Sequence, residues 1–414
     1  MTNKLKIALF MQGGRGWLGG VEYIKNLILA LGSLPDQARS TFEVHLISGE
    51  PLDDTLHRQL APYVKQFYRQ DVDLQPLTFL NRSRWLLERK LLKKSNPRLE
   101  ALIKKQGFDF LYPHATDQAR ASNYRSAAWI PDFQHKYLPQ FFTAQELNDR
   151  DQSYSSIAQC SESVVLSSKT AAEDFKKFFP DAANKARVLS FKTSSSPVWY
   201  EGDPQQTQQN YHLPDRFFLI SNQFWQHKNH LVAFKALKLL QERSIFPTLV
   251  CTGHIYDYRK PDYSDIVLQT IHQLGIAKQV HLLGLIPKND QVQLMRRSLA
   301  IIQPSLFEGW STLVEDARCL GKPMILSDLP VNLEQDPPGS VFFDRHSPEH
   351  LADLIEQAWV HHSLGPDLVA EDRARKKSCE EVQAYGYCFL ELARGVVHPD
   401  IRNVHSIAVG TDIT

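Results

Sequence analysis

The chain has 414 residues, of which 43% are hydrophobic and 22% are charged. This composition is typical of globular proteins and excludes a largely disordered chain, and a length well above the usual one-domain range predicts two domains. Lys and Arg total 47 against 46 for Asp and Glu, a net charge of +1, so no bulk positive field indicates a nucleic-acid partner and any anion site must be local.

Targeting and redox signals are weak. No apolar run approaches the roughly 18 residues of a membrane-spanning helix, and the amino-terminal MTNKLKIALFM lacks the pattern of a signal peptide. The five cysteines are scattered without a Cys-x-x-Cys pair, so they indicate neither a disulfide framework nor a zinc site. We therefore expect a cytoplasmic protein with reduced thiols.

In the first half of the chain, short β-rich apolar runs alternate with segments of helical period. Residues 6–11 read as a buried strand, a glycine loop follows, and apolar residues at helical spacing predict a helix over 21–31. Further strands are predicted at 42–48, 108–112, 127–130 and 163–167. This alternation implies crossover helices and a mostly parallel sheet.

The second half repeats the pattern after a polar, Ser- and Gln-rich stretch that we interpret as a linker. A helix is predicted on Leu231, Phe234, Leu237 and Leu240, and another begins at Ser347-Pro348, an N-cap followed by a proline at the first helical position. Strands are predicted at 217–221, 248–252, 279–283, 299–303 and 324–327. Open α/β sheets bind ligands beyond the carboxyl ends of their strands, so a cleft between two such sheets is the expected site.

The glycine loop between the first strand and helix has two functional interpretations. Gly14-x-Gly16-x-x-Gly19 matches the dinucleotide fingerprint, with Glu50 as the ribose acid, so an NAD-dependent oxidoreductase is an alternative. The loop is longer than that motif's turn, however, and positions 19 and 50 are 31 residues apart where about 20 is usual. More generally, Gly16, Gly19 and Gly20 let backbone N–H groups approach an anion at a helix N-terminus; a loop without a ligand is the other alternative.

A carboxylate segment, residues 304–323 (PSLFEGWSTLVEDARCLGKP), is the most informative stretch. A predicted strand ends near Gln303, a turn carries Glu308, and a short helix is predicted from Thr312 as N-cap to Gly321. Glu308 then points into the crevice. The free N–H groups of residues 313–315 face the same space, where they can bind phosphate or sugar hydroxyls.

With the glycine loop, this segment resembles the retaining glycosyltransferases of the GT-B fold, family 4 or group 1, whose signature is two acids about eight residues apart ahead of Gly-x-Pro. In that family the first acid faces the donor sugar, and Glu308 matches it. The second acid holds the nucleotide ribose, and either Glu315, one residue short, or the shorter Asp316 takes its place. Because Thr312-x-x-Glu315 also reads as a capping box, we favour Asp316. The resemblance adds Gly309, Trp310, Ser311 and Thr312 as donor-binding residues.

A second matching segment is residues 222–230 (NQFWQHKNH), which is similar to the family's Gly-Arg-x-x-x-x-Lys diphosphate grip. Lys228 falls on the lysine, but Gln223 takes the arginine position, so one of two usual cations is missing. A solvent-exposed lysine at a helix start is the alternative. His227 and His230 suggest a metal only with a third ligand, which the sequence does not offer nearby.

Three weaker matches lie elsewhere. His135 follows a strand, resembles the family's cleft histidine and is a candidate catalytic residue that polarises a hydroxyl; a structural histidine is the alternative. Gly253 and Leu285 follow strands where the family seats the sugar and base. Asp-x-Asp at 71–73 is the metal motif of the other glycosyltransferase fold, but it lies in a polar connection, and we expect no metal.

Residues 81–105 carry nine Lys or Arg against two Glu, interleaved with apolar residues. Such a basic amphipathic segment is compatible with an anionic membrane or a lipid-linked acceptor. A solvated helix face over ordinary core is the alternative. The sequence thus leaves two expectations open, a cytoplasmic protein without membrane contact and one attached peripherally at the inner membrane face.

The resemblance implies an α/β GT-B fold, two Rossmann-like domains facing across a cleft. We expect an amino-terminal acceptor-side domain (1–192), a linker (193–212), a nucleotide-sugar domain (213–375) and a carboxyl-terminal helix (376–400) that packs back on the first domain. It further implies transfer of a hexose-type sugar from a nucleotide-sugar donor to a glycan or lipid-linked glycan, with retention and no cofactor, as in polysaccharide biosynthesis. A non-catalytic sugar-nucleotide-binding subunit is a further alternative.

Overall fold

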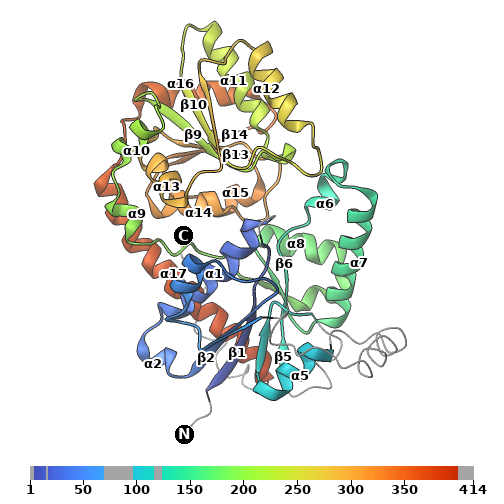
Figure 1. Cartoon of the computed structure of the whole chain (residues 1–414). Coiled ribbons are helices and arrows are strands. Elements are labelled where there is room, and N and C mark those ends of the chain that lie inside the picture. Colours follow the sequence, from blue (N-terminus) through green and yellow to red (C-terminus); the bar gives the residue numbers. More distant parts are fainter. Residues whose placement is uncertain (1–3, 15–16, 70–96, 116–123, 400–414) are drawn as a thin grey trace.

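The computed structural model describes residues 4–14, 17–69, 97–115 and 124–399. Two α/β domains lie one above the other, and the long helix α17 (Leu368–Val397) runs beside both of them (Figure 1). All five cysteines are free. None of the helices in the described ranges is long and apolar enough to cross a membrane.

The amino-terminal domain contains two parallel sheets where the sequence predicts a single one. The first has the order β3-β2-β1-β4-β5 and the second the order β6-β7-β8. The predicted strand 127–130 is the point of division, because the N–H of Ala127 donates to Leu111 in the first sheet while the N–H of Ala128 donates to Ser163 beside the second. The strands are β1 (Leu5–Phe10), β2 (Phe42–Ser48), β3 (Gln66–Arg69), β4 (Phe110–Tyr112), β5 (Arg125–Ser126), β6 (Ala128–Ile130), β7 (Val164–Leu166) and β8 (Ala186–Val188).

Helices cover these sheets through apolar faces. In α1, the side chains of Ile24, Leu27, Ile28 and Leu31 recur at helical spacing and are all buried in the core beside β1 and β2. The helices of this domain are α1 (Leu18–Gly32), α2 (Asp36–Arg39), α3 (Asp54–Leu60), α5 (Pro97–Gln106), α6 (Gln134–Tyr137), α7 (Ala144–Cys160) and α8 (Lys169–Phe178).

The carboxyl-terminal domain has one six-stranded parallel sheet of order β11-β10-β9-β12-β13-β14. The strand order reverses beside β9, whose five residues are all buried, and such a switch point opens a crevice at the carboxyl ends of the strands. The strands are β9 (Phe217–Ser221), β10 (Thr248–Thr252), β11 (Val280–Gly284), β12 (Ile301–Gln303), β13 (Met324–Ser327) and β14 (Ser340–Phe343). The helices are α11 (His230–Glu242), α12 (Tyr263–Gln273), α13 (Lys288–Arg297), α14 (Thr312–Cys319), α15 (Pro330–Gln335) and α16 (Pro348–His361).

Local signals place several of these elements well. The strands predicted at 42–48, 217–221 and 248–252 are confirmed residue for residue. The N-cap at the start of α16 is also confirmed, since the Ser347 hydroxyl accepts from the N–H of His350 at 3.1 Å and Pro348 follows it.

The stretch predicted as a plain linker, 193–212, is partly helical. It contains α9 (Val198–Glu201) and α10 (Pro204–Asn210), and α10 packs against α13. The Asp203 carboxylate accepts from the N–H of Gln206 at 2.9 Å, and Pro204 stands at the first helical position. The polar composition therefore concealed an Asp-Pro helix start.

Helix α17 begins earlier than predicted, at Leu368 rather than at residue 376, because Asp367 caps its first turn. Near this end Glu371 forms a buried ion pair with Arg296 of the carboxyl-terminal domain, with N–O distances of 2.7 and 3.0 Å. Further along, Phe389 is fully buried and its ring lies 5.1 Å from that of Tyr112 in β4. One helix thus packs against both domains.

We expect Phe389→Ala to lower the free energy of unfolding by about 3–5 kcal/mol, because it leaves a cavity beside β4 and α1. Urea unfolding measures this change. Tyr387→Ala is the matched control, since Tyr387 lies on the same helix and is 40% exposed. Equal losses in the two variants would contradict the inclusion of α17 in the amino-terminal core.

Candidate functional site

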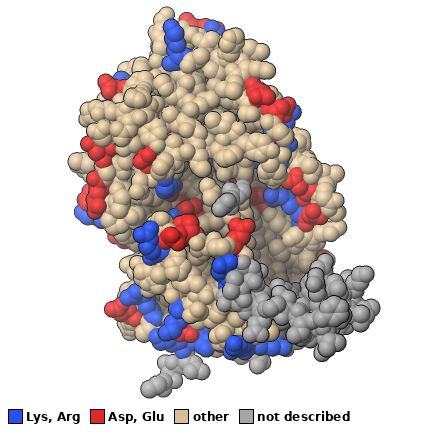
Figure 2. All heavy atoms as spheres, viewed as in Figure 1, with Lys and Arg blue, Asp and Glu red and all other residues tan. Residues whose placement is uncertain are grey.

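A cavity of about 950 Å³ lies in the cleft between the two domains. Its walls come from the starts of helices and the carboxyl ends of strands in both domains, including the loop before α1, the loop between β6 and α6, and the segment between β12 and α14. Around the waist between the domains, side chains of both charge signs gather (Figure 2). The near-zero net charge of the chain therefore conceals local charges at this cleft.

Most of the predicted site residues line this cavity, and three described ones do not. The lining includes Gly19, Gln223, Lys228, Gly253, Leu285, Glu308, Gly309, Trp310, Ser311, Thr312 and Asp316. His135, Glu315 and Gly20 are not part of it. Gly16 lies outside the described residues.

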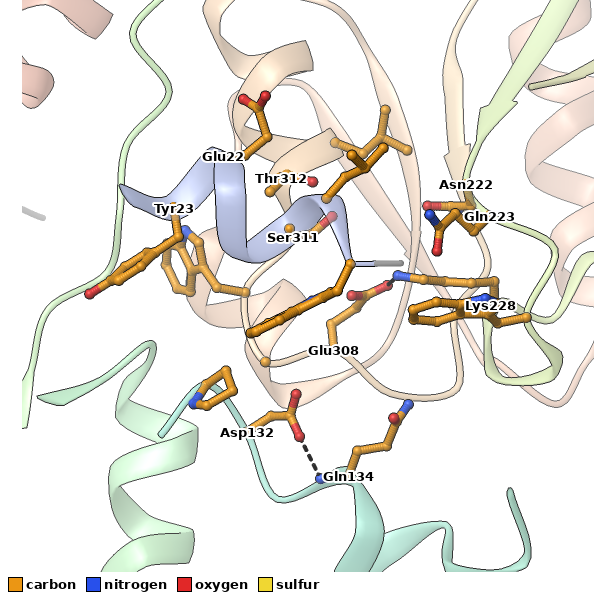
Figure 3. Close-up of a pocket in the computed structure, with 18 of the residues that line it drawn as sticks. Glu22, Tyr23, Asp132, Gln134, Asn222, Gln223, Lys228, Glu308, Ser311 and Thr312 are labelled. Carbon is orange, nitrogen blue, oxygen red and sulfur yellow. Dashed lines mark hydrogen bonds and ion pairs between the residues drawn. The ribbon is translucent and has the colours of Figure 1, made fainter. Parts of the chain in front are cut away.

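Glu308 and Lys228 meet inside the cavity as an ion pair (Figure 3). The Nζ of Lys228 lies 2.6 Å from Oε1 of Glu308, and the same oxygen accepts from Nε2 of Gln303 at 2.8 Å. The side chains of Lys228 and Glu308 are only 16% and 9% exposed. Lys228 is therefore not the solvent-exposed lysine that the sequence left as an alternative.

The N-cap of α14 is Ser311, and the prediction of Thr312 is wrong. Ser311 has extended backbone angles, and its hydroxyl accepts from the N–H of Val314 at 3.3 Å, while Thr312 is already helical. The predicted capping box between Thr312 and Glu315 therefore does not form. A serine one position earlier carries the same hydroxyl, so local sequence could not separate the two caps.

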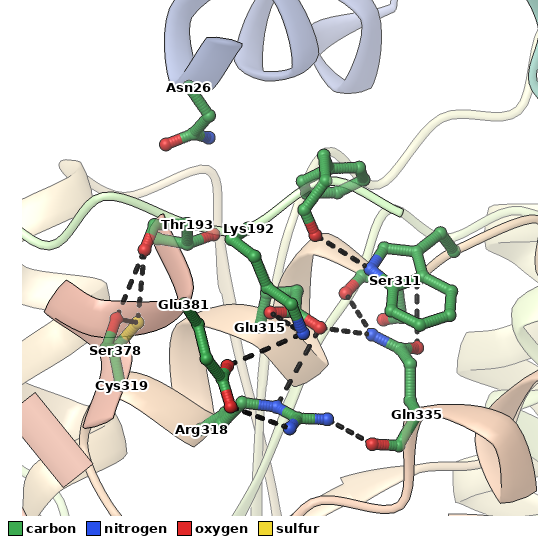
Figure 4. A network of polar contacts seen from close by, with 12 residues as sticks. Asn26, Lys192, Thr193, Ser311, Glu315, Arg318, Cys319, Gln335, Ser378 and Glu381 are labelled. Carbon is green, nitrogen blue, oxygen red and sulfur yellow. Dashed lines mark hydrogen bonds and ion pairs between the residues drawn. The ribbon is translucent and has the colours of Figure 1, made fainter. Parts of the chain in front are cut away.

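Glu315 and Asp316 point to different sides of α14. Glu315 is 1% exposed and turned away from the cavity: its Oε1 accepts from Gln335 at 3.0 Å, and its carboxylate lies 3.6 Å from Lys192 (Figure 4). Asp316 lines the cavity, where Lys288 and the hydroxyl of Thr193 donate to its two oxygens. Of the two candidates for the second acid, only Asp316 can reach a ligand in the cavity.

His135 is placed differently from the prediction. It is 2% exposed, and its Nε2 lies 3.0 Å from Oδ1 of Asp151, on α7. Burial lowers the pKa of this imidazole. The cavity wall in this segment is formed instead by Pro131, Asp132 and Gln134, where the Gln134 N–H donates to the Asp132 carboxylate at 2.9 Å.

Arg259 is a cavity residue that the sequence analysis did not identify. Its guanidinium lies 4.8 Å from the ring of Trp225, and its Nε is 3.3 Å from Asp257. Burial lowers the pKa of the neighbouring His227 imidazole, and the charges of Lys228 and Arg259 lower it further. The wall therefore contains an arginine, although the motif in this wall has Gln223 at its arginine position. Arg259 comes from a polar loop after β10 with no local signal of function.

The histidine pair does not form a metal site. His230 is fully buried and stacks on Phe224 at 4.1 Å, away from the cavity lining. Among the residues that the structure describes, no group of three or more His, Cys, Asp or Glu is arranged to hold a metal ion. The Asp-x-Asp at 71–73 lies outside those residues, as does the part of the basic segment before Pro97, where α5 begins.

Residues 203–363 match the family model described as Glycosyl transferases group 1. This range contains the whole of the carboxyl-terminal sheet and includes Lys228, Glu308 and Asp316. No curated protein sequence is similar enough to the chain to count as a relative.

Solved structures resemble the chain over nearly its whole length. A glycosyltransferase from Rickettsia africae has a TM-score of 0.62 at 15% identity, covering 97% of this chain and 100% of its own. HepE of Anabaena, in complex with UDP and glucose, has 0.61 at 15%, covering 96% and 98%. Sucrose-phosphate synthase from Thermosynechococcus elongatus has 0.62 at 15%, covering 97% and 100%. At this identity the likeness shows the fold, and the predicted GT-B fold of two Rossmann-like domains is confirmed.

Stability should depend on pH through His230. Burial lowers its pKa to about 3, and neither ring nitrogen has a hydrogen-bond partner among the described residues. Below pH 6.5 the unfolded chain takes up a proton that native His230 does not, so stability falls by about 1.6 kcal/mol between pH 6.5 and 5.

We expect His230→Phe, which keeps the stack on Phe224, to remove this share of the pH dependence. Urea unfolding at the two pH values measures it, with His272→Phe on the exposed face of α12 as control. A loss as large in His230→Phe as in the wild type would contradict a neutral, buried His230.

Proposed function

We propose that the protein is a glycosyltransferase that moves a hexose-type sugar from a nucleotide-sugar donor to a hydroxyl of a glycan or lipid-linked glycan. The observation that carries this proposal is the Lys228–Glu308 pair in the wall of a cleft cavity, within a segment that matches the glycosyl transferases group 1 family. We further propose that the reaction retains the anomeric configuration and needs no metal ion, because the acidic signature of residues 304–323 resembles that of the retaining family.

In this proposal the cations of the carboxyl-terminal wall hold the donor diphosphate. Lys228 and Arg259 line the same wall, and a lysine about 4 Å from a phosphate charge contributes on the order of 4 kcal/mol at an effective dielectric near 20, before desolvation. Thr312 and Leu313, the first two residues of α14, line the cavity, and N–H groups in the first turn of a helix have no acceptor within the helix. Such preorganised donors stabilise the charge that develops on a departing diphosphate.

The nucleoside is assigned to the other side of this wall. Asp316 accepts from Lys288 and Thr193, and its position beside the cavity suits a bond with ribose hydroxyls. Gly253 and the 67%-exposed Leu285 border the space left for the base. HepE of Anabaena has been crystallised with UDP-glucose, which makes that compound the first donor to test.

The chemistry of the proposed step is a substitution at the anomeric carbon. The bond between that carbon and the diphosphate oxygen breaks, the acceptor hydroxyl oxygen bonds to the carbon, and the hydroxyl proton leaves toward the released nucleotide. Glu308 positions the donor sugar during this exchange. The acceptor would enter from the amino-terminal wall, where Trp17, Glu22 and Asp132 lie.

The NAD-dependent alternative is not favoured. Glu50 does not line the cavity, and the family match falls on the other domain from the glycine loop. A thermal-shift panel of UDP, GDP, ADP, their glucose conjugates and NADH tests the proposal directly. Stabilisation by a nucleotide sugar together with release of its free nucleotide is expected. Stabilisation by NADH alone would overturn the proposal.

Lys228→Ala should weaken nucleotide affinity by about 1.5–3 kcal/mol, the contribution of a charged hydrogen bond. Isothermal calorimetry with the nucleotide that the panel selects measures it. Lys238→Ala on the exposed side of α11 is the matched control, because Lys238 lies outside the cavity lining. An unchanged affinity in Lys228→Ala would remove its assignment to the diphosphate.

Glu308→Gln should reduce nucleotide-sugar turnover by about 100-fold or more and leave nucleotide binding and the melting temperature close to those of the wild type. Glu380→Gln, on the exposed side of α17, controls for the loss of one negative charge. Turnover near the wild-type rate in Glu308→Gln would exclude Glu308 from the reaction. Equal nucleotide release by the wild type and by both cavity variants, Lys228→Ala and Glu308→Gln, would show that the measured release is not enzymatic.

A further inference from the structure

We propose that Gln303 is a positioning residue for Glu308: its buried amide, oriented by Asn222, holds one carboxylate oxygen of Glu308 so that the other faces the donor sugar. This inference rests on the proposed function. It assigns a role to a residue that touches neither donor nor acceptor.

The contacts of Gln303 form a continuous relay across two neighbouring strands. Gln303 is the last residue of β12 and is fully buried. Its Nε2 donates to Oε1 of Glu308 at 2.8 Å and to the hydroxyl of Ser311 at 3.2 Å, and its Oε1 accepts from Nδ2 of Asn222 at 2.7 Å. Asn222 directly follows β9, which pairs with β12, so the two strand ends bring the amides together.

The chemistry of the two amides fixes which end of Gln303 faces Glu308. An ionised carboxylate accepts hydrogen bonds only, so the amide nitrogen must point toward it. Asn222 reinforces this orientation, because its own N–H donates to the oxygen end of Gln303. Both amide hydrogens and the amide oxygen of Gln303 are then used, which offsets the cost of a polar side chain at the end of an apolar strand.

The relay matters because Lys228 has two tasks. In the structure Lys228 pairs with Oε1 of Glu308. The proposed function requires the same lysine to reach the diphosphate of a bound nucleotide sugar. When Lys228 turns to a phosphate, Gln303 keeps hold of the same oxygen. Because its amide is uncharged, Gln303 is not drawn toward the phosphate charge as Lys228 is. Among the described contacts of Glu308, both hydrogen bonds fall on Oε1, which leaves Oε2 for a sugar hydroxyl.

The experiment compares turnover with nucleotide binding in Gln303→Met, which keeps the length of the side chain and removes its donors. Gln293→Met is the matched control: Gln293 is also a buried glutamine of this domain, bonded to Trp199 and Arg296, outside the cavity lining. Gln303→Met should lower kcat about 10- to 100-fold with the dissociation constant for UDP within about two-fold of the wild type. Gln293→Met should lower the melting temperature without lowering kcat.

A second variant, Gln303→Glu, tests the same role if Gln303→Met does not fold. The introduced carboxyl has the shape of the amide but donates to Glu308 only when protonated. The ratio of its kcat to that of the wild type should therefore rise as the pH is lowered from 8 to 5.5. A ratio that does not change with pH, or a kcat for Gln303→Met within two-fold of the wild type, would overturn the proposal.

The outcome separates this inference from the proposed function. An active wild type with a fully active Gln303→Met leaves the glycosyltransferase assignment intact and removes the relay. A wild type that binds no nucleotide and releases none from any donor in the panel overturns both. Binding of the nucleotide that the panel selects, with one site per chain by calorimetry, shows in each variant that the carboxyl-terminal domain is folded.

Discussion

The ion pair between Lys228 and Glu308 is the contact on which the rest of the cavity depends. A carboxylate with 9% exposure needs a partner, because an isolated buried charge is costly. The two residues meet because β9 and β12 are neighbours at the point where the strand order reverses, so that their carboxyl ends open onto one crevice. In the proposed function the donor phosphate competes for Lys228, and the role proposed for the amide of Gln303 is to keep the carboxylate in place during that exchange.

The two domains also contact each other away from this pair, at the segment before the linker and at α17. Lys192 lies within 3.6 Å of Glu315 on α14 and 3.5 Å of Glu381 on α17, so three segments meet at one charged cluster (Figure 4). Gly309 shows how closely the domains approach, because a Cβ there would lie 2.4 Å from the carbonyl oxygen of Pro131. Glu315 contacts Lys192 and Gln335 in this junction, while its neighbour Asp316 lines the cavity.

Expectations from local patterns succeeded where the determinant is local. The strand at 217–221 and the Ser347 cap follow from periodicity and capping chemistry within a few residues. They failed where a distant partner decides: the strand at 127–130 is divided because its first residue hydrogen-bonds to one sheet and the next residue to another. The cap at Ser311 rather than Thr312 belongs to the same class, since Gln335 of α15 hydrogen-bonds to both the N–H and the carbonyl oxygen of Ser311.

The resemblance of two short segments to the glycosyltransferase family was enough to bring Lys228 and Glu308 into consideration, because each motif lies within about twenty consecutive residues. It favoured Asp316 over Glu315, in agreement with the cavity lining, but it wrongly included His135 in the wall and did not find Arg259 or Gln303. Each of those outcomes rests on which side of a helix faces the cleft or on contacts between strands far apart in sequence. Burial and cross-strand contact arise only when the two domains fold and meet.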